Sequence, residues 1–163
     1  MLLTTTDEST TLLLNAVRSD ATASTRLRAC SPEHAKHPDA RLEQVGLQEL
    51  TFEGEFDAVM CIDAMEHAPP EEWPLVLANL HRAVRPGGLL YLTVEETDEA
   101  EHAACSRGLP AVRGEYVGPD TGGYHHYPDR GQVRAWFDAE GLEIEDEADE
   151  GLDGYGYFHL LVR

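Results

Sequence analysis

Positive charge is scarce in this chain of 163 residues, which has 12 lysines and arginines against 31 aspartates and glutamates. The formal net charge is therefore −19. So much negative charge repels a phosphate backbone and an anionic membrane surface. We expect neither nucleic acid nor a membrane to be a partner.

Long apolar runs and paired cysteines are also missing. Near the N-terminus the longest apolar run, Leu12 to Leu14, is far too short to cross a bilayer, and no basic segment precedes it. Cys30, Cys61 and Cys105 form no CxxC pair of the kind that binds zinc or a redox centre. We therefore expect reduced thiols in a cytoplasmic protein.

Glycine does not occur in the first 45 residues, whereas glycine and proline recur from Gly46 onward. The shift divides an atypical leader from an ordinary α/β body within one domain of the usual size. In the leader, Thr10 to Val17 is either a strand or a short helix, because the run is too short for periodicity to decide. We expect Arg26 to Cys30 to be a strand followed by a helix that starts at Ser31, and Arg41 to Val45 to be another strand.

A strand, helix, strand unit follows. Phe56 to Ile62 is almost wholly apolar, as in a parallel strand that is covered on both faces. From Pro70 to Arg85 the apolar residues recur at helical spacing, and Pro86-Gly87-Gly88 should end this helix. Leu89 to Val94 is a second buried strand, which predicts a right-handed parallel crossover.

The rest of the chain predicts a long loop, a helix and a hairpin. Glu95 to Arg130 is polar and without periodicity, so it should be a functional or disordered loop. Gly131 to Glu140 reads as a short amphipathic helix that ends at Gly141. Two closing antiparallel strands are expected at Leu142 to Glu145 and Tyr155 to Val162, joined by an acidic, glycine-containing turn. The acidic run Glu143 to Glu150 is expected to lie on this solvated hairpin.

Three motifs carry a resemblance to a known family: FDAVMCIDAMEH, RPGGLLYLTVEE and the closing GYGYFHLLVR. Together they resemble the second half of a class I S-adenosylmethionine (SAM)-dependent methyltransferase of bacterial small-molecule type, over Ser31 to Arg163. The resemblance thus implies a family-like body at residues 31–163 and leaves residues 1–30 as an atypical leader. The resemblance implies a Rossmann-like α/β fold with a parallel sheet and a C-terminal antiparallel hairpin, in which the first β-α unit is reduced or missing. It also implies methyl transfer from SAM to an oxygen or nitrogen of a small molecule.

The resemblance also assigns residues to the cofactor. Asp63, Ala64 and Met65 would lie beneath the methionine portion of SAM, and Leu47 and Gln48 would border the adenine. The family's glycine-rich turn, which lets the backbone approach the cofactor closely, is missing here. The acids that usually accept from the ribose and lie near the adenine are replaced by Ala29 and Gly46. These departures imply weakened or lost SAM binding.

The cluster Asp63, Glu66 and His67 can be interpreted in three ways. It resembles the pattern by which small-RNA and ubiquinone-pathway O-methyltransferases hold a divalent metal, and His125 or His126 would then complete the shell. Alternatively, Glu66 and His67 merely cap the following loop. His67 also suits a general base, because an unperturbed histidine titrates near neutrality.

The loop tip, Gly122 to Tyr127, is dense in hydrogen-bonding aromatic residues. Tyr124 and Tyr127 would form a substrate lid with His125 and His126, and Glu95 would face the substrate; the alternative is a surface loop without a ligand. We expect the catalytic groups among four residues, namely Glu66, His67, His125 and His126. Trp73, Trp136 and His159 are assigned to the core or the sheet instead.

Three functions remain open at this point. The chain is a small-molecule methyltransferase, a non-methylating homologue that serves as a binding or partner subunit, or an enzyme with SAM-independent chemistry such as a cyclisation. Loss of the family's first strand and helix would also uncover apolar sheet surface, which a second copy could cover. A homodimer is therefore expected.

Overall fold

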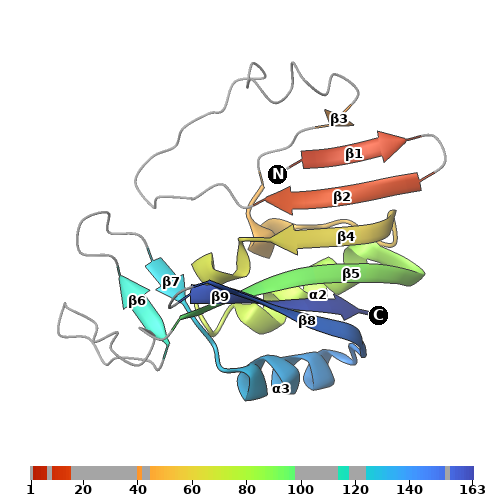
Figure 1. Cartoon of the computed structure of the whole chain (residues 1–163). Helices are drawn as coiled ribbons and strands as arrows, with labels where there is room; N and C mark the ends of the chain where they lie inside the picture. The colour runs from red at the N-terminus through yellow and green to blue at the C-terminus, as the bar shows by residue number, and fades with distance from the viewer. Residues whose placement is uncertain are drawn as a thin grey trace.

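The computed structural model describes residues 2–6, 9–15, 40–41, 45–97, 114–117, 124–152 and 155–163. Its centre is a seven-stranded sheet with the strand order β3-β1-β2-β4-β5-β9-β8, beside a small two-stranded ribbon, β6-β7 (Figure 1). The strands are β1 Leu2–Thr6, β2 Ser9–Asn15, β3 Ala40–Arg41, β4 Phe56–Ile62, β5 Val84–Thr97, β6 Glu115–Val117, β7 Tyr124–His126, β8 Ile144–Leu152 and β9 Tyr155–Val162. The helices are α2 Trp73–Ala83 and α3 Arg130–Glu140, with two 3-10 turns, η1 Leu47–Glu49 and η2 Met65–His67.

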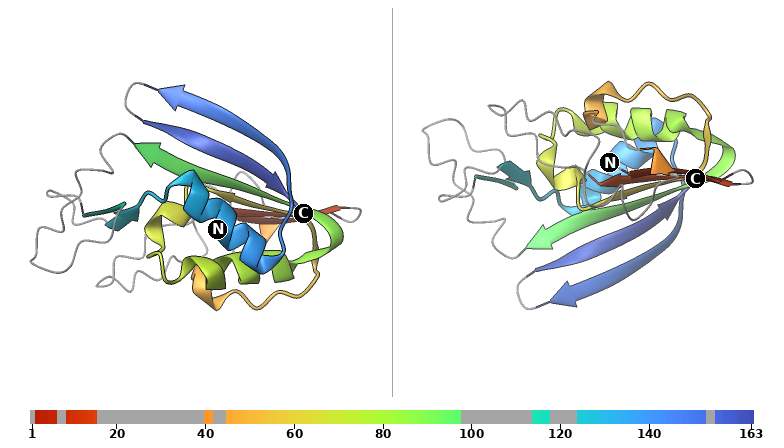
Figure 2. Two further views of the ribbon diagram at one scale, coloured as in Figure 1. Left: turned by 90° about the horizontal axis from the view of Figure 1, so that it is seen from below. Right: turned by 90° about the horizontal axis from the view of Figure 1, so that it is seen from above.

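The middle of the sheet is parallel, and its C-terminal edge is antiparallel. β2, β4 and β5 run in the same direction, β9 pairs antiparallel with β5, and β8 pairs antiparallel with β9. Both helices lie on the same face of the sheet (Figure 2). The predicted parallel pairing of Phe56–Ile62 with Leu89–Val94 and the predicted closing hairpin are confirmed.

The helix α2 is held to the sheet by one apolar stripe. Trp73, Val76, Leu77 and Leu80 are fully buried, as their three- and four-residue spacing predicts. The indole of Trp73 donates a hydrogen bond to the carbonyl oxygen of Ala68 at 3.2 Å, which fixes the chain before the helix. The helix is shorter at both ends than predicted.

The RPGG segment is part of β5. α2 ends at Ala83, and Val84 already pairs with Phe56 before a register shift in the β4-β5 ladder. Gly87 has a left-handed φ of 77°. A Cβ on Gly88 would lie 2.5 Å from the carbonyl oxygen of Asp57. The two glycines are thus needed for different reasons, one for its φ angle and one for the close approach of β4.

The helix α3 agrees with the prediction from the sequence, whereas the closing hairpin agrees with it only in part. Asp129 caps α3 by accepting from the N–H of Gln132, and Gly141 ends it with a φ of 76°. The acidic run lies on an exposed hairpin, as expected, but the first strand of this hairpin is longer than predicted, because β8 continues through the run to Leu152. Arg130 holds this strand, since its guanidinium donates to both Glu96 of β5 and Asp149 of β8.

His159 belongs to the sheet, as expected. Its Nδ1 lies 2.6 Å from the hydroxyl of Tyr91, and its Nε2 lies 3.4 Å from a carboxylate oxygen of Glu150. It therefore joins side chains of β5, β9 and β8.

At the other side of the sheet, β2 pairs with β4, so the described part of the ambiguous segment, Thr10 to Asn15, is a strand. The edge of β4 is therefore covered, which removes that edge as a reason for a homodimer. Of Arg41 to Val45, Arg41 ends β3, whereas Val45 lies outside any strand. The strand and helix predicted between Arg26 and Asp39 lie outside the described residues, as do Cys30 and Cys105.

Two further observations concern the cysteine and membrane predictions. Cys61 is a free thiol buried in β4, and burial raises its pKa well above the usual range. None of the helices in the described part of the chain is long and apolar enough to span a membrane.

We predict that Gly88→Ala destabilises the fold more than Gly87→Ala. The added methyl at residue 88 meets backbone, so a loss of about 2–3 kcal/mol in the free energy of unfolding is expected from overpacking. At residue 87 the Cβ meets nothing within 4 Å. Only the left-handed φ then costs stability, about 1 kcal/mol. Urea unfolding of the two variants and the parent measures this difference. A lower free energy of unfolding for Gly87→Ala than for Gly88→Ala would contradict the explanation.

Candidate active site at the ends of β4 and β5

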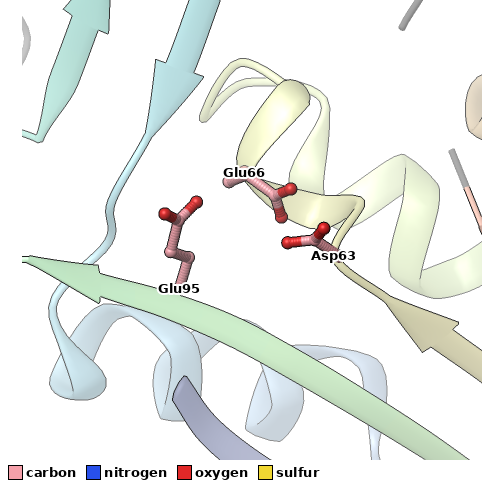
Figure 3. Close-up of side chains that lie close together, drawn as sticks. All are labelled: Asp63, Glu66 and Glu95. Carbon is pink, nitrogen blue, oxygen red and sulfur yellow. The ribbon is translucent and has the colours of Figure 1, made fainter. Parts of the chain in front are cut away.

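The acidic residues of the predicted site come together at the carboxyl ends of two neighbouring parallel strands. Asp63 directly follows β4, Glu66 lies in η2, and Glu95 lies near the end of β5 (Figure 3). One carboxylate oxygen from each of the three lies within 4.8 Å of the others. Ligands of open α/β sheets bind beyond the carboxyl ends of the strands, so this is the edge where a site is expected.

Asp63 is held in an unusual backbone conformation. Its φ is 53°, in the left-handed region that aspartate tolerates better than most residues. Its N–H donates to the hydroxyl of Thr93 at 2.9 Å, and its Oδ1 accepts from the hydroxyl of Tyr157 at 2.6 Å. Neither Thr93 nor Tyr157 was predicted from the sequence to belong to the site. The alternation of β5 and β9 would place both on the sheet, but only the register between strands reveals that they meet Asp63.

The carboxyl groups of Glu66 and Glu95 are strongly perturbed. Glu66 is only 2 % exposed. Burial raises its pKa to about 8; a backbone hydrogen bond partly offsets this, and the charges of Asp63 and Glu95 add to it. Burial and the charge of Asp63 raise the pKa of Glu95 to about 7. The site therefore crowds negative charge into a poorly solvated space.

His67 lies beside this cluster, with both ring nitrogens engaged. Its Nδ1 is 3.3 Å from the carbonyl oxygen of Tyr124, and its Nε2 is 3.3 Å from Oε1 of Glu66. Since a carbonyl oxygen only accepts, Nδ1 carries a proton in this arrangement. The second nitrogen is therefore the one that faces the acidic site.

The ribbon β6-β7 brings part of the predicted lid to the site. Nδ1 of His125 lies 3.7 Å from Oε2 of Glu95, and the rings of His125 and His67 meet edge to face with centroids 4.8 Å apart. Tyr127 stacks on His125, with centroids 5.8 Å apart. Tyr124 donates from its hydroxyl to Glu115 at 2.8 Å, and burial together with Glu115 raises its pKa.

His126 points the other way. It is fully buried and lies against two stacked indoles, those of Trp73 and Trp136, at ring distances of 6.1 and 6.2 Å. Alternation along β7 explains why neighbouring histidines face different sides of the ribbon. The structure thus brings His125, but not His126, next to Glu95.

The residues predicted to hold the cofactor are spread over two turns. Ala64 and Met65 are fully buried directly after Asp63. Leu47 and Gln48 form η1, whose carbonyl oxygens each accept from the side-chain amide of Asn79 at 3.0 Å. The side chain of Gln48 also donates to Glu72. These contacts join η1 to α2.

The sequence profile of the family described as "Methyltransferase domain" matches residues 14–88. Over 127 residues the chain is 32% identical to the ubiquinone biosynthesis O-methyltransferase of Xanthomonas axonopodis pv. citri (strain 306). The matched region covers 73% of this chain and 48% of that protein. The chain belongs to the class I SAM-dependent methyltransferase family. It spans about half the length of the curated methyltransferases that it matches.

Solved methyltransferases confirm the Rossmann-like fold. The 1,6-didemethyltoxoflavin-N1-methyltransferase of Burkholderia thailandensis, solved with 1,6-didemethyltoxoflavin and S-adenosylhomocysteine, superimposes with a TM-score of 0.63 at 18% identity, covering 81% of this chain and 54% of that one. The cyclase SpnF superimposes with a TM-score of 0.56 at 17% identity, over 80% of this chain and 59% of that one. The same architecture is thus found in proteins with different names and reactions.

We predict that Glu66→Gln stabilises this methyltransferase family member at alkaline pH. A carboxyl whose pKa rises from 4.5 unfolded to about 8 folded costs stability progressively as pH increases through that window, and the cost is complete above the folded pKa. Glutamine does not ionise, so the melting temperature of the variant should exceed that of the parent by roughly 5 °C near pH 9, with little or no gain near pH 4. Thermal unfolding in the presence of a chelator measures this difference. A difference that stays constant across the pH range would contradict a buried, perturbed carboxyl.

Proposed function

We propose that this chain transfers a methyl group from SAM to a hydroxyl oxygen of a small molecule. The observation that carries the proposal is the position of the Glu66–His67 pair, 3.3 Å apart at the carboxyl edge of the parallel strands. The name of the Xanthomonas relative, an O-methyltransferase, supports oxygen as the acceptor. A nitrogen acceptor, as in the name of the Burkholderia protein, is the alternative that the same site geometry allows.

The described residues suit the cationic half of SAM. SAM carries an ammonium group and a sulfonium, and the exposed carboxylate of Asp63 offers an acceptor of opposite charge at the expected place. Asp63, Ala64 and Met65 would hold the methionine portion, and Leu47 and Gln48 would border the adenine. When bound, SAM supplies an electrophilic methyl group. The lack of glycine in the first 45 residues predicts a weaker hold on the adenosine half.

The role of the chain's own groups is to receive the hydroxyl proton and to enclose the acceptor. His67 keeps a proton on Nδ1, which faces the Tyr124 carbonyl, so a proton taken from the acceptor would reside on Nε2. The carboxylate of Glu66 would then stabilise the imidazolium. Tyr124, Tyr127 and Glu95 would border the acceptor, because they share this edge with His67.

Two experiments test the proposal, SAM binding first and methyl transfer second. Isothermal titration with SAM and S-adenosylhomocysteine should give heat with dissociation constants on the order of 0.1–1 mM, about 4–5.5 kcal/mol of binding free energy. Purified chain with methyl-labelled SAM and a panel of phenols, catechols and aromatic amines should then give labelled product from the hydroxylated acceptors. If no heat appears up to millimolar ligand, the proposal is wrong.

We predict that His67→Ala lowers methyl transfer by about 10²–10⁴-fold, the usual contribution of a general base. SAM affinity should stay within a factor of about two to three, because His67 is not among the residues assigned to SAM. His81→Ala is the matched control, since His81 lies in α2, where its Nδ1 is 3.7 Å from a carboxylate oxygen of Glu140. A loss of transfer in the control, or an unchanged rate in His67→Ala, would contradict the role of His67.

The alternatives are favoured by the missing glycine turn and by one structural neighbour. A chain that binds S-adenosylhomocysteine but transfers nothing would be a non-methylating binding or partner subunit. A chain that binds neither nucleoside would favour SAM-independent chemistry, which the name of the cyclase neighbour illustrates on this fold. A cytoplasmic location and a homodimer stay predictions from the sequence.

A further inference from the structure

We infer that Tyr157, on the last strand of the sheet, is a positioning residue for SAM, because it fixes the orientation of the Asp63 carboxylate. Thr93 has the same role toward the backbone of Asp63. Both residues act through Asp63 and not on the reacting atoms. The inference rests on the proposed function in taking the methionine portion of SAM as the ligand of Asp63.

Asp63 needs support from outside its own turn. Among the residues that the structure describes, it is the only residue other than glycine with a positive φ, at 53°. Such a conformation is unfavourable for an L-residue and persists where the surrounding structure holds it. The side chain is also exposed, so solvent does not confine its carboxylate to one direction. Contacts from other elements must therefore keep Asp63 in one orientation.

Two hydrogen bonds supply these contacts, one to the backbone and one to the side chain. The N–H of Asp63 donates to the hydroxyl oxygen of Thr93 at 2.9 Å. The hydroxyl of Tyr157 donates to Oδ1 of Asp63 at 2.6 Å, a short distance that is typical of hydrogen bonds to an ionised carboxylate. Together the two contacts fix the direction of the carboxylate, and Oδ2 is the oxygen that this arrangement offers to a ligand.

Strand register brings Tyr157 to a residue that is distant in the sequence. Tyr157 lies opposite Glu95 in the antiparallel ladder of β5 and β9, at the end of β5 where the site lies. Thr93 precedes Glu95 by two residues and therefore faces the same side of the sheet. Figure 1 shows β5 between β4 and β9, so the side chain of Tyr157 reaches past one strand to the turn after β4. Both anchors are strand residues, which hold a site more rigidly than loop residues do.

The chemistry of the phenol suits a cofactor with a positive charge. The hydroxyl of Tyr157 is a neutral donor, so it orients the carboxylate of Asp63 without neutralising it. A lysine or arginine would also orient the carboxylate, but its charge would repel the ammonium group of SAM. An acceptor that is fixed before binding loses less freedom when the ligand arrives, which strengthens the complex. Tyr157 should therefore act on the affinity for the methionine portion.

The test compares two nucleosides that differ in this portion. S-adenosylhomocysteine carries the amino-acid group, whereas 5′-methylthioadenosine lacks it. Both are titrated by NMR, which measures dissociation constants in the millimolar range. Tyr157→Phe should weaken binding of S-adenosylhomocysteine by about five- to tenfold, as expected for a lost hydrogen bond to a charged group. Binding of 5′-methylthioadenosine should stay within a factor of about two of the parent.

Tyr91→Phe is the matched control for the lost hydroxyl. Tyr91 lies on the same face of β5 as Thr93, but its hydroxyl is 2.6 Å from Nδ1 of His159. This variant should bind both nucleosides like the parent. Thr93→Val removes the other anchor at nearly constant volume, and it should weaken S-adenosylhomocysteine selectively, as Tyr157→Phe does. Thermal unfolding confirms that each variant is folded.

A double-mutant cycle separates positioning from direct contact with the cofactor. Asp63→Gly removes the carboxylate and accepts the left-handed φ. If Tyr157 acts through Asp63, Tyr157→Phe should weaken S-adenosylhomocysteine by less than about twofold further in this background. A full further loss would show that Tyr157 touches the cofactor itself, and it would overturn the positioning role.

Kinetics and binding separate this inference from the proposed function. In methyl transfer, Tyr157→Phe should raise the SAM concentration needed for half-maximal rate by about five- to tenfold and leave the rate at saturation within about twofold. Equal weakening of both nucleosides, or unchanged binding of S-adenosylhomocysteine, would overturn the role of Tyr157 even if the parent transfers methyl groups. The expected binding pattern without transfer would reject the proposed function alone. A parent that binds neither nucleoside would reject both.

Discussion

The parallel pairing of β4 with β5 is the constraint on which the site depends. Val59, Met60 and Cys61 lie opposite Leu90, Tyr91 and Leu92, so both strands end at the same edge of the sheet. Asp63 and Glu95 meet there although they are far apart in the sequence. Had the strands been antiparallel, the two carboxylates would lie at opposite ends of the sheet and no acidic cluster would form. The apolar run of β4 and the buried face of α2 favour a parallel crossover, so β4 and β5 run in the same direction. That direction brings Asp63 and Glu95 together.

This pairing concentrates like charge, and the surroundings are arranged to hold it in place. Tyr157 and Thr93 hold Asp63 from β9 and β5, while His67 and His125 approach Glu66 and Glu95. The raised pKa values of Glu66 and Glu95 show that these contacts do not remove the cost of burying carboxylates side by side. Structural stability alone would favour glutamine or an apolar residue in such a place. The acidic cluster is therefore kept at a cost in the stability of the fold.

Much of the body of the fold was predictable, because its elements have strong local signals. β4, α2, α3 and β9 were predicted from buried runs, helical spacing, and glycine or proline at their ends. β8 was misjudged because its residues are acidic and exposed, and only pairing with β9 and the ion pairs of Arg130 make it a strand. For the site, Asp63, Glu66 and Glu95 were identified as candidates, but the sequence alone did not reveal that they form one cluster without His67. The roles of Tyr157 and Thr93 depend on strand register, which has no local signal.

The location of the described site also separates two questions that the sequence alone did not distinguish. One is whether the acceptor side is complete, and the other is whether the adenosine half of SAM is held. Every group in the acidic cluster and its outer contacts comes from residue 63 onward, whereas the departures from the family's cofactor contacts fall at Gly46 and earlier. The acceptor side can therefore be complete while the adenosine side is weakened. A weak hold on SAM that still lets bound SAM react raises the SAM concentration needed for half-maximal rate and leaves the rate at saturation largely intact. A lost acceptor side would instead lower the rate at saturation and leave the SAM concentration needed for half-maximal rate largely unchanged. The half-saturating SAM concentration and the saturated rate therefore measure the two halves of this site separately.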